Sequence, residues 1–280
     1  MKIDEKLAKR EFPTQVVNRD LLKYIALLLM TLGHWALLLL RWTHNRTLVR
    51  FATSAEFFAP PVFFFFIAEG YHYSKNKGKY ALRLLIFAIV TQVPHALSDP
   101  DGLTPQTLFL RWSVLMTLFL GLCSLLVLHG TWRTITFRSR KDGASKKWEG
   151  DSPDRPSGVL DTSFYPLRFL VIAGLMGISY VLNSEWAVGG IAVILMFDLL
   201  RNMPLLRLVV YIPLIYCVVW MNLEELPTLT SGWRILVPMW CAGLAITFLY
   251  SGKKGHFPTF SKYFFYVWYP LHLLIQWAAG

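Results

Sequence analysis

Long hydrophobic runs alternate with short polar segments along the whole 280-residue chain. Each run is near the roughly 20 residues that an α-helix needs to cross a hydrocarbon core of about 30 Å. The pattern predicts an all-α polytopic integral membrane protein, one helix bundle with about nine transmembrane helices. The expected spans are residues 21–40, 51–70, 80–97, 107–128, 168–183, 186–200, 204–221, 233–250 and 262–278.

Several expected spans are short, partly polar or interrupted by proline. Such helices suit the wall of a cavity inside the protein better than a surface bathed in lipid. The spans at 168–183 and 186–200 are so short that a re-entrant pair is an alternative. Pro60 and Pro61 should break the second span near the middle of the membrane and free backbone carbonyls there.

Composition and charge support this class. The chain is 55% hydrophobic and 16% charged, whereas a soluble domain carries roughly a quarter charged residues. The formal net charge of +11 does not require nucleic acid as a partner, because Lys and Arg collect in segments that alternating spans place on one side. The positive-inside rule makes that side the cytoplasm, so we expect a cytoplasmic N-terminus in a cell (inner) membrane. The basic segments are residues 2–23, 75–83, 129–168, 201–207 and 253–262.

The chain divides into four expected parts that form one membrane domain. They are a cytoplasmic segment (1–20), spans one to four (21–128), a polar cytoplasmic linker (129–167) and spans five to nine (168–280). The linker is rich in Arg, Lys, Ser, Pro, Gly and Asp. Either it contacts anionic lipid or an acidic ligand, or it is a tether whose positive charge only sets the orientation in the membrane. The three cysteines, Cys123, Cys217 and Cys241, lie in apolar runs without metal or redox spacing, so we expect no disulfide and no metal site.

The first expected span, LLKYIALLLMTLGHWALLLL, carries His34 deep within its apolar run. A titratable side chain inside a span is costly and is therefore a functional candidate. Lys23 lies on the same helical face, about 16 Å below His34. A cation at the cytoplasmic mouth can hold phosphates while the imidazole acts on the far end of a long ligand, such as an acyl-coenzyme A. Alternatively, Lys23 is a membrane-surface anchor and His34 a helix-packing residue.

Other spans also contain polar residues. Glu56 lies toward the outer end of the second span, and Glu69 lies at its inner end, near Arg83 of the third. Glu69 and Arg83 either form a structural pair, or Arg83 joins Lys23 around a phosphate. Two pairs with i, i+3 spacing, each around a proline, make a shared interior site plausible. These pairs are Gln92 with His95 and Tyr269 with His272.

Several separated motifs together suggest a family. They are LLKYIALLLMTLGHW, FFIAEGYHYSKNKGKYALRLLIFAIVTQVP, EWAVGGI at 185–191 and FFYVWYPLHLLI at 264–275. In this order they resemble the TraX family of F-pilin acetylation proteins, over most of the chain except 129–167. The resemblance marks Lys23, His34, Glu69, Gly70, Arg83, Gln92, Tyr269 and His272. The Lys-x10-His spacing is also similar to the Arg-x10-His spacing of the membrane acyltransferase-3 group.

The resemblance implies a multi-pass acetyltransferase that uses acetyl-coenzyme A, or another acyl-coenzyme A, as co-substrate. The acceptor would be an amine or hydroxyl of a peptide, a glycan or a small molecule. Two departures from the family pattern bear on this. Gly33 stands where the family has an aspartate before its histidine, and residues 54–58 read SAEFF in place of a Gly-Arg pair. Glu56, in that altered stretch, is a candidate to supply the missing carboxylate from another helix.

We therefore expect a membrane-bound acyltransferase with His34 as general base near the thioester. The runner-up is a non-enzymatic membrane protein, either a transporter or an inactive scaffold partner, and Gly33 is its best support. The candidate catalytic residues are His34, Tyr269 and His272; the candidate coenzyme-binding residues are Lys23 and Arg83; and the supporting polar residues are Glu56, Glu69 and Gln92.

Overall fold

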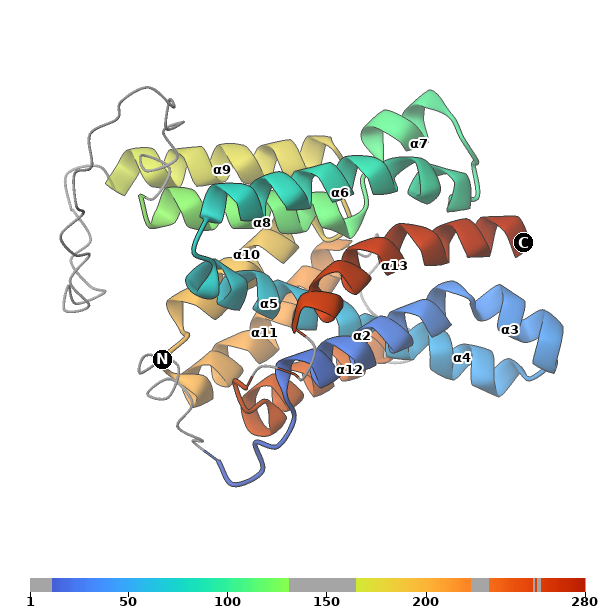
Figure 1. The fold of residues 1–280 in the computed structure, drawn as a ribbon, viewed down its shortest axis with the longest axis horizontal. Helices are drawn as coiled ribbons and strands as arrows, with labels where there is room; N and C mark the ends of the chain where they lie inside the picture. Colours follow the sequence, from blue (N-terminus) through green and yellow to red (C-terminus); the bar gives the residue numbers. More distant parts are fainter. Residues whose placement is uncertain (1–11, 131–164, 223–231, 254, 256–257, 280) are drawn as a thin grey trace.

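The computed structural model describes residues 12–130, 165–222, 232–253, 255 and 258–279. Their secondary structure is helical apart from one isolated β-bridge, so the all-α prediction is confirmed. The helices lie side by side along the long axis of one bundle (Figure 1). Their bounds are α2 Arg19–His34, α3 Ala36–Thr43, α4 Arg46–Ala55, η1 Glu56–Phe58, α5 Ala59–Tyr73, α6 Lys77–Ser98, α7 Pro105–Leu110, α8 Val114–Leu128, α9 Tyr165–Val181, α10 Ala187–Leu199, α11 Pro204–Asn222, α12 Gly232–Leu244, η4 Ala245–Leu249 and α13 Pro258–Ala279.

Within the described residues, five helices are long and apolar enough to cross a membrane, and up to six if the bent pair α2 and α3 counts as one span. Helices α9 and α10 are apolar but shorter. The protein is thus a multi-pass helical membrane protein, while the count of nine spans and the orientation remain predictions. The candidates are Arg46–Tyr73, Lys77–Ser98, Pro105–Leu128, Pro204–Asn222 and Gly232–Leu249.

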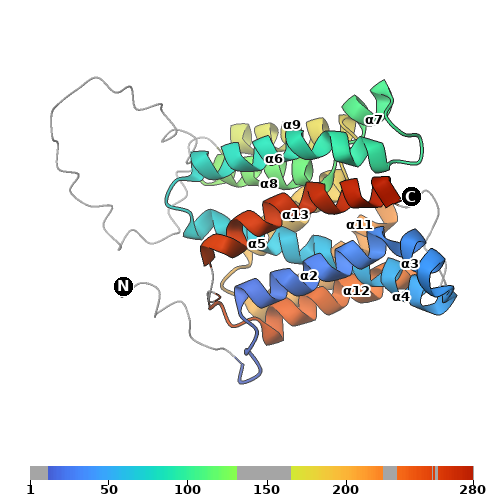
Figure 2. The ribbon, with the colours of Figure 1, turned by 45° about the vertical axis from the view of Figure 1, so that its right-hand side comes forward.

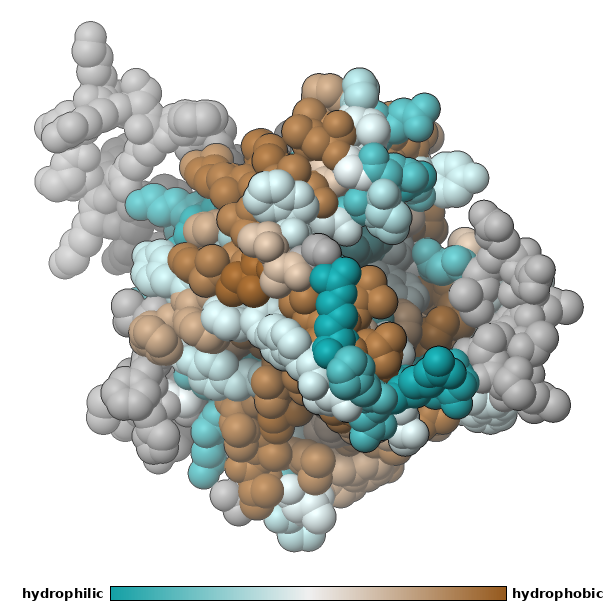
Figure 3. Space-filling model, turned by 90° about the vertical axis from the view of Figure 1, so that its right-hand side faces the viewer, coloured by the Kyte–Doolittle hydropathy of each residue, from teal (hydrophilic) through white to brown (hydrophobic). Residues whose placement is uncertain are grey.

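The packing combines a mainly apolar core with some buried polar side chains, and it leaves large apolar side chains on the outside, where lipid can cover them. Helices α5, α8 and α10 pack against one another, and the α8 side chains Thr117 and Ser124 are buried. Helices α9 and α11 turn large hydrophobic side chains outward, among them Leu170 and Val209. In both ribbon views, the α3–α4 hairpin, α7 and the C-terminus lie at one end of the bundle (Figures 1 and 2). That end carries hydrophilic residues across its middle, with hydrophobic residues above and below (Figure 3).

The first expected span, 21–40, is not one straight helix. Helix α2 ends at His34, and α3 continues at a bend of 67°. Trp35 lies between them with φ −86° and ψ 17°, outside the helical region. Its indole Nε1–H donates to the carbonyl of His272, 3.0 Å away. This contact holds Trp35 against α13 at the corner, immediately after His34.

The expected break at Pro60 and Pro61 is also corrected. Both prolines lie in the first turn of α5, which directly follows the 3₁₀ turn of η1, and Arg46–Tyr73 continues as one candidate span. Proline is tolerated in a first helical turn, because amide N–H groups there lack an intrahelical acceptor. The change of helix type falls instead on η1, which contains Glu56.

Candidate functional site

Helix α2 carries two candidate residues into two cavities. Lys23 and Leu27 line a cavity of about 510 Å³, here called the Lys23 cavity. Met30 and His34, further along the same face, line a second cavity of about 600 Å³, the His34 cavity. The shared face predicted from the helical period therefore faces the protein interior over three turns.

The lining of the Lys23 cavity has more cations than anions. Lys23, Arg19 and Arg83 line it together with the carboxylates of Asp20 and Glu69. The Lys23 ammonium lies 4.6 Å from the centre of the Phe66 ring and 5.7 Å from that of Phe265. Aromatic faces stabilise such a cation away from water. This arrangement provides positive charge for an anionic ligand.

Arg83 has a buried Nε that lacks a hydrogen-bond partner among the described residues. An unsatisfied buried guanidinium nitrogen costs free energy, so a phosphate or carboxylate ligand would stabilise it. Glu69, the other member of the expected pair, accepts a hydrogen bond from the Tyr250 hydroxyl at 2.5 Å. Glu69 also lines the Lys23 cavity.

The His34 cavity combines titratable and polar groups with an apolar wall. His34, Glu56, Glu185 and Tyr269 line it. Trp186 lines it as well; it is the N-cap residue directly before α10 and has a left-handed backbone conformation with φ 64°. A largely apolar cavity with a few converging polar groups is the usual form of a small-molecule site.

His34 is held in one tautomer by the backbone. Its Nδ1 lies 2.8 Å from the carbonyl oxygen of Met30. A carbonyl can only accept a hydrogen bond, so Nδ1 carries the hydrogen, and in the neutral ring Nε2 keeps a free lone pair. The side chain is 27% exposed. His34 can therefore accept a proton at Nε2 from a molecule in the cavity.

Glu56 takes the space that a side chain at residue 33 would occupy. A Cβ added to Gly33 would overlap the Glu56 carboxylate oxygen and lie 2.6 Å from its Cδ. The Glu56 Oε2 atom is 3.7 Å from His34 Nδ1. The chain thus brings a carboxylate from η1 to the place beside His34 where its own helix has only glycine.

His272 and Tyr269 complete the group. The ring centres of His34 and His272 are 5.1 Å apart in an edge-to-face arrangement, and Tyr269 lies 5.3 Å from His272. The Nδ1 atom of His272 is 3.1 Å from the Trp268 carbonyl. Its Nε2 is buried without a partner in the described part of the chain. The i, i+3 pair of the last span therefore meets His34.

The two cavities share part of their walls. Phe63, Val114 and Tyr269 line both. Tyr269 is buried and carries the polar group of this shared wall. A long ligand in the Lys23 cavity would have its far end at this wall, next to His34.

Gln92 is not part of either cavity. Its side-chain amide donates to the carbonyls of Thr107, Leu108 and Arg111 at 3.0, 3.0 and 2.7 Å. These carbonyls lie at the end of α7, so Gln92 caps that helix. The structure gives this expected supporting residue a local structural contact.

Glu185 is a residue of the site that the sequence analysis did not select. It lies just before α10, lines the His34 cavity and pairs with His95, its Oε1 3.1 Å from His95 Nε2. Its signal was present, because Glu185 is the first residue of the EWAVGGI motif.

A bundle of apolar helices around two adjoining cavities, each largely apolar with a few polar groups, defines a multi-pass membrane protein with an interior site. The family model of the TraX protein matches residues 18–279. The chain belongs to the TraX family, and membership implies a membrane acetyltransferase-like protein. Searches of curated proteins and of solved structures each find no match.

Proposed function

We propose that this protein is a membrane acyltransferase that transfers acetyl from acetyl-coenzyme A to an amine or hydroxyl acceptor. One observation carries the proposal: Lys23 and His34, on one helix, line two cavities that share a wall. The coenzyme is long and thin, with phosphates at one end and the thioester at the other. The cations of the Lys23 cavity suit the phosphates, and the wall shared with the His34 cavity suits the thioester.

The coenzyme enters the Lys23 cavity from the cytoplasm, in the orientation that the positive-inside rule favours. Lys23 and Arg83 bind its phosphates as charge-assisted hydrogen-bond donors. The pantetheine arm then follows α2 toward Tyr269. The rise of a helix places Lys23 and His34 about 16 Å apart, which is about the reach of that arm.

The chemistry takes place at His34. The acceptor nitrogen or oxygen attacks the thioester carbonyl, and His34 Nε2 removes its proton. The carbon–sulfur bond breaks, and the thiolate of coenzyme A leaves and takes the proton from the imidazolium. The Tyr269 hydroxyl donates to the carbonyl oxygen as negative charge develops there. Glu56 stabilises the imidazolium, and His272, which is fully buried and lines neither cavity, packs against the His34 ring and holds it in place.

The acceptor occupies the His34 cavity, with Glu185 beside it. The proposed acceptors are a peptide, a glycan or a small molecule, and the proposed location is the cell (inner) membrane. A transporter is the second candidate, because two cavities with a common wall also fit a solute path. The two classes differ in whether a covalent bond forms.

The test uses the full-length protein in native membrane vesicles that hold its acceptor. Vesicles receive acetyl-coenzyme A labelled in the acetyl group, and label in lipid, protein and small-molecule fractions is counted. Wild type should label one fraction, and His34→Gln should lower the rate about 10²- to 10⁴-fold, since glutamine cannot serve as the base.

His44→Gln is the matched control, because His44 is exposed at the end of α3. It should transfer at the wild-type rate. Absence of label in every wild-type fraction would support the transporter or scaffold alternative. An active His34→Gln protein would move the base to His272.

A further inference from the structure

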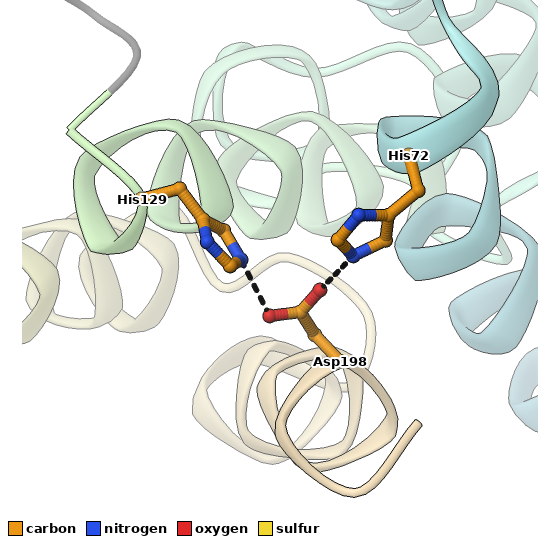
Figure 4. A group of neighbouring side chains, drawn as sticks. All are labelled: His72, His129 and Asp198. Carbon is orange, nitrogen blue, oxygen red and sulfur yellow. Dashed lines mark hydrogen bonds and ion pairs between the residues drawn. The ribbon is translucent and has the colours of Figure 1, made fainter. Parts of the chain in front are cut away.

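Two histidines and an aspartate from three helices meet outside the two cavities (Figure 4). His72 lies in the last turn of α5, His129 directly follows α8, and Asp198 lies in the last turn of α10. Asp198 Oδ1 is 2.5 Å from His72 Nε2, and Asp198 Oδ2 is 2.7 Å from His129 Nε2. One carboxylate thus bridges two imidazoles.

The three side chains offer ligand atoms that all lie within 4.8 Å of one another. Within the described ranges, no other group of three or more His, Cys, Asp or Glu residues meets in this way. The Asp198 side chain is 2% exposed, whereas the imidazoles of His72 and His129 are 27% and 33% exposed. The carboxylate is therefore buried, while the histidine side is open to an entering ion.

We propose that His72, His129 and Asp198 bind a divalent transition-metal ion and that zinc is the preferred ion. Zinc takes imidazole nitrogens at about 2.0–2.1 Å and carboxylate oxygens at about 2.0–2.2 Å. The present nitrogen–oxygen contacts would have to lengthen, by rotation of the side chains, to admit an ion at these distances. Imidazole ligands disfavour magnesium and calcium, which prefer oxygen. Two histidines and one carboxylate leave a fourth position for water or another ligand.

The surrounding residues hold the two rings in place. Tyr71 stacks on His129 with ring centres 5.0 Å apart and planes 22° apart, and it meets His72 edge-to-face at 5.1 Å. Fixed ligand orientation raises metal affinity, because less conformational freedom is lost on binding.

Two cations lie close to this cluster. Arg168 donates to the carbonyl of Leu128, the residue before His129, and the Lys77 ammonium lies 4.4 Å from the Tyr71 ring centre. The positive charge of Arg168 and Lys77 repels any cation at this site. Only an ion that forms strong bonds to imidazole nitrogen would overcome this repulsion. Zinc and copper do so, and alkali or alkaline-earth ions do not.

A bound ion would tie the ends of α5, α8 and α10 together. Two of these helices also line both cavities, α5 through Phe63 and α8 through Val114. The metal proposal does not depend on the acyltransferase proposal. It departs from the expectation of no metal site, which considered the cysteines and not histidines at helix ends.

The experiment uses the full-length protein in detergent, with a purification tag that lacks histidine. After dialysis against zinc, the bound metal is counted by mass spectrometry, and cobalt is titrated into metal-free protein. Wild type should hold about one ion per chain and give the visible absorption of four-coordinate cobalt, which zinc then removes.

Asp198→Asn and His129→Gln should each hold close to no zinc after dialysis, whereas His44→Gln, which removes an exposed imidazole elsewhere, should match wild type. Equal binding by all four proteins would mean adventitious binding and overturn the proposal. Absence of the cobalt spectrum in wild type would do the same and leave only a hydrogen-bonded cluster. The wild-type spectrum decides the question even if a variant fails to fold.

Discussion

The first prediction concerns the carboxylate beside His34. Moving this carboxylate from residue 56 to residue 33 tests whether acetyl transfer depends on a carboxylate next to the His34 imidazole. Glu56 lies where a side chain at residue 33 would extend. The perturbation is Gly33→Asp combined with Glu56→Gly, compared with each single variant and with Glu56→Gln. If His34 needs a nearby carboxylate, Glu56→Gly should slow transfer, and Gly33→Asp should restore part of the rate.

The magnitude follows from the geometry. A carboxylate 3.7 Å from the imidazole interacts with an imidazolium by about 4 kcal/mol at an effective dielectric constant of about 20. Both side chains are about a quarter exposed, at 27% and 24%, so solvent screening reduces this value. About 1–3 kcal/mol remains, so Glu56→Gln should lower kcat/KM by roughly 5- to 150-fold.

The single variant Gly33→Asp should be less stable than the double variant. Its Cβ would overlap both the carboxylate and the Cβ of Glu56. Overpacking of this kind costs about 1–3 kcal/mol. Gly33→Asp alone should therefore lower the unfolding temperature, and Glu56→Gly in the same chain, which removes both the carboxylate and the Cβ, should remove that loss.

The assay measures initial rates of label transfer from acetyl-coenzyme A in vesicles, with the amount of inserted protein determined on the same samples. Thermal unfolding in detergent gives the stability of each variant. A double variant that inserts, is as stable as wild type and remains as slow as Glu56→Gly would refute the reasoning. Glu56 would then be a packing residue at Gly33.

Three further predictions concern the coenzyme end, the shared wall and the orientation. Lys23→Met should raise the KM for acetyl-coenzyme A, while Lys23→Arg keeps most activity; an unchanged KM for Lys23→Met would make Lys23 a membrane-surface anchor. Tyr269→Phe should lower kcat about 10²- to 10³-fold, as loss of an oxyanion donor does, and a kcat within twofold of wild type would exclude that role. In a cysteine-free background, Leu103→Cys should react with an impermeant maleimide from outside intact cells, and Lys75→Cys only after permeabilisation; the reverse pattern would invert the proposed orientation.

The sequence was sufficient to predict which candidate residues lie together when both belong to one helix. Lys23 and His34 share a face because their spacing is close to whole helical turns, and that face lines both cavities. The i, i+3 spacing of Tyr269 and His272 likewise placed these residues together. In each case local backbone geometry fixes the relation, whatever the remaining helices do.

Relations between helices could not be obtained in the same way. The overlap of Glu56 with Gly33 depends on how η1 packs on α2, and sequence reasoning could offer Glu56 only as a candidate. Gln92 is a case in which the sequence suggested a functional role and the structure shows a local contact. A polar residue inside a span predicted a place in the functional site, whereas the side chain donates to carbonyls at the end of α7. A buried side-chain amide needs hydrogen-bond partners, and the free carbonyls at a helix end satisfy it as well as a ligand does.

The cluster of His72, His129 and Asp198 could not be predicted from sequence spacing, because its members are far apart in the chain. His72 is 126 residues from Asp198, and His129 is 69 residues from it. Each residue lies at the end of a different helix, where polar side chains are ordinary. Only the convergence of α5, α8 and α10 brings them to one place.

The wall shared by the two cavities has a consequence for membrane permeability. Phe63, Val114 and Tyr269 line both cavities. In the proposed orientation, the Lys23 cavity lies on the cytoplasmic side of this wall and the His34 cavity on the outer side. Packed hydrophobic side chains exclude water and ions from such a constriction. If these three side chains separate the cavities in the membrane, we expect truncation of Phe63 to create a leak for ions.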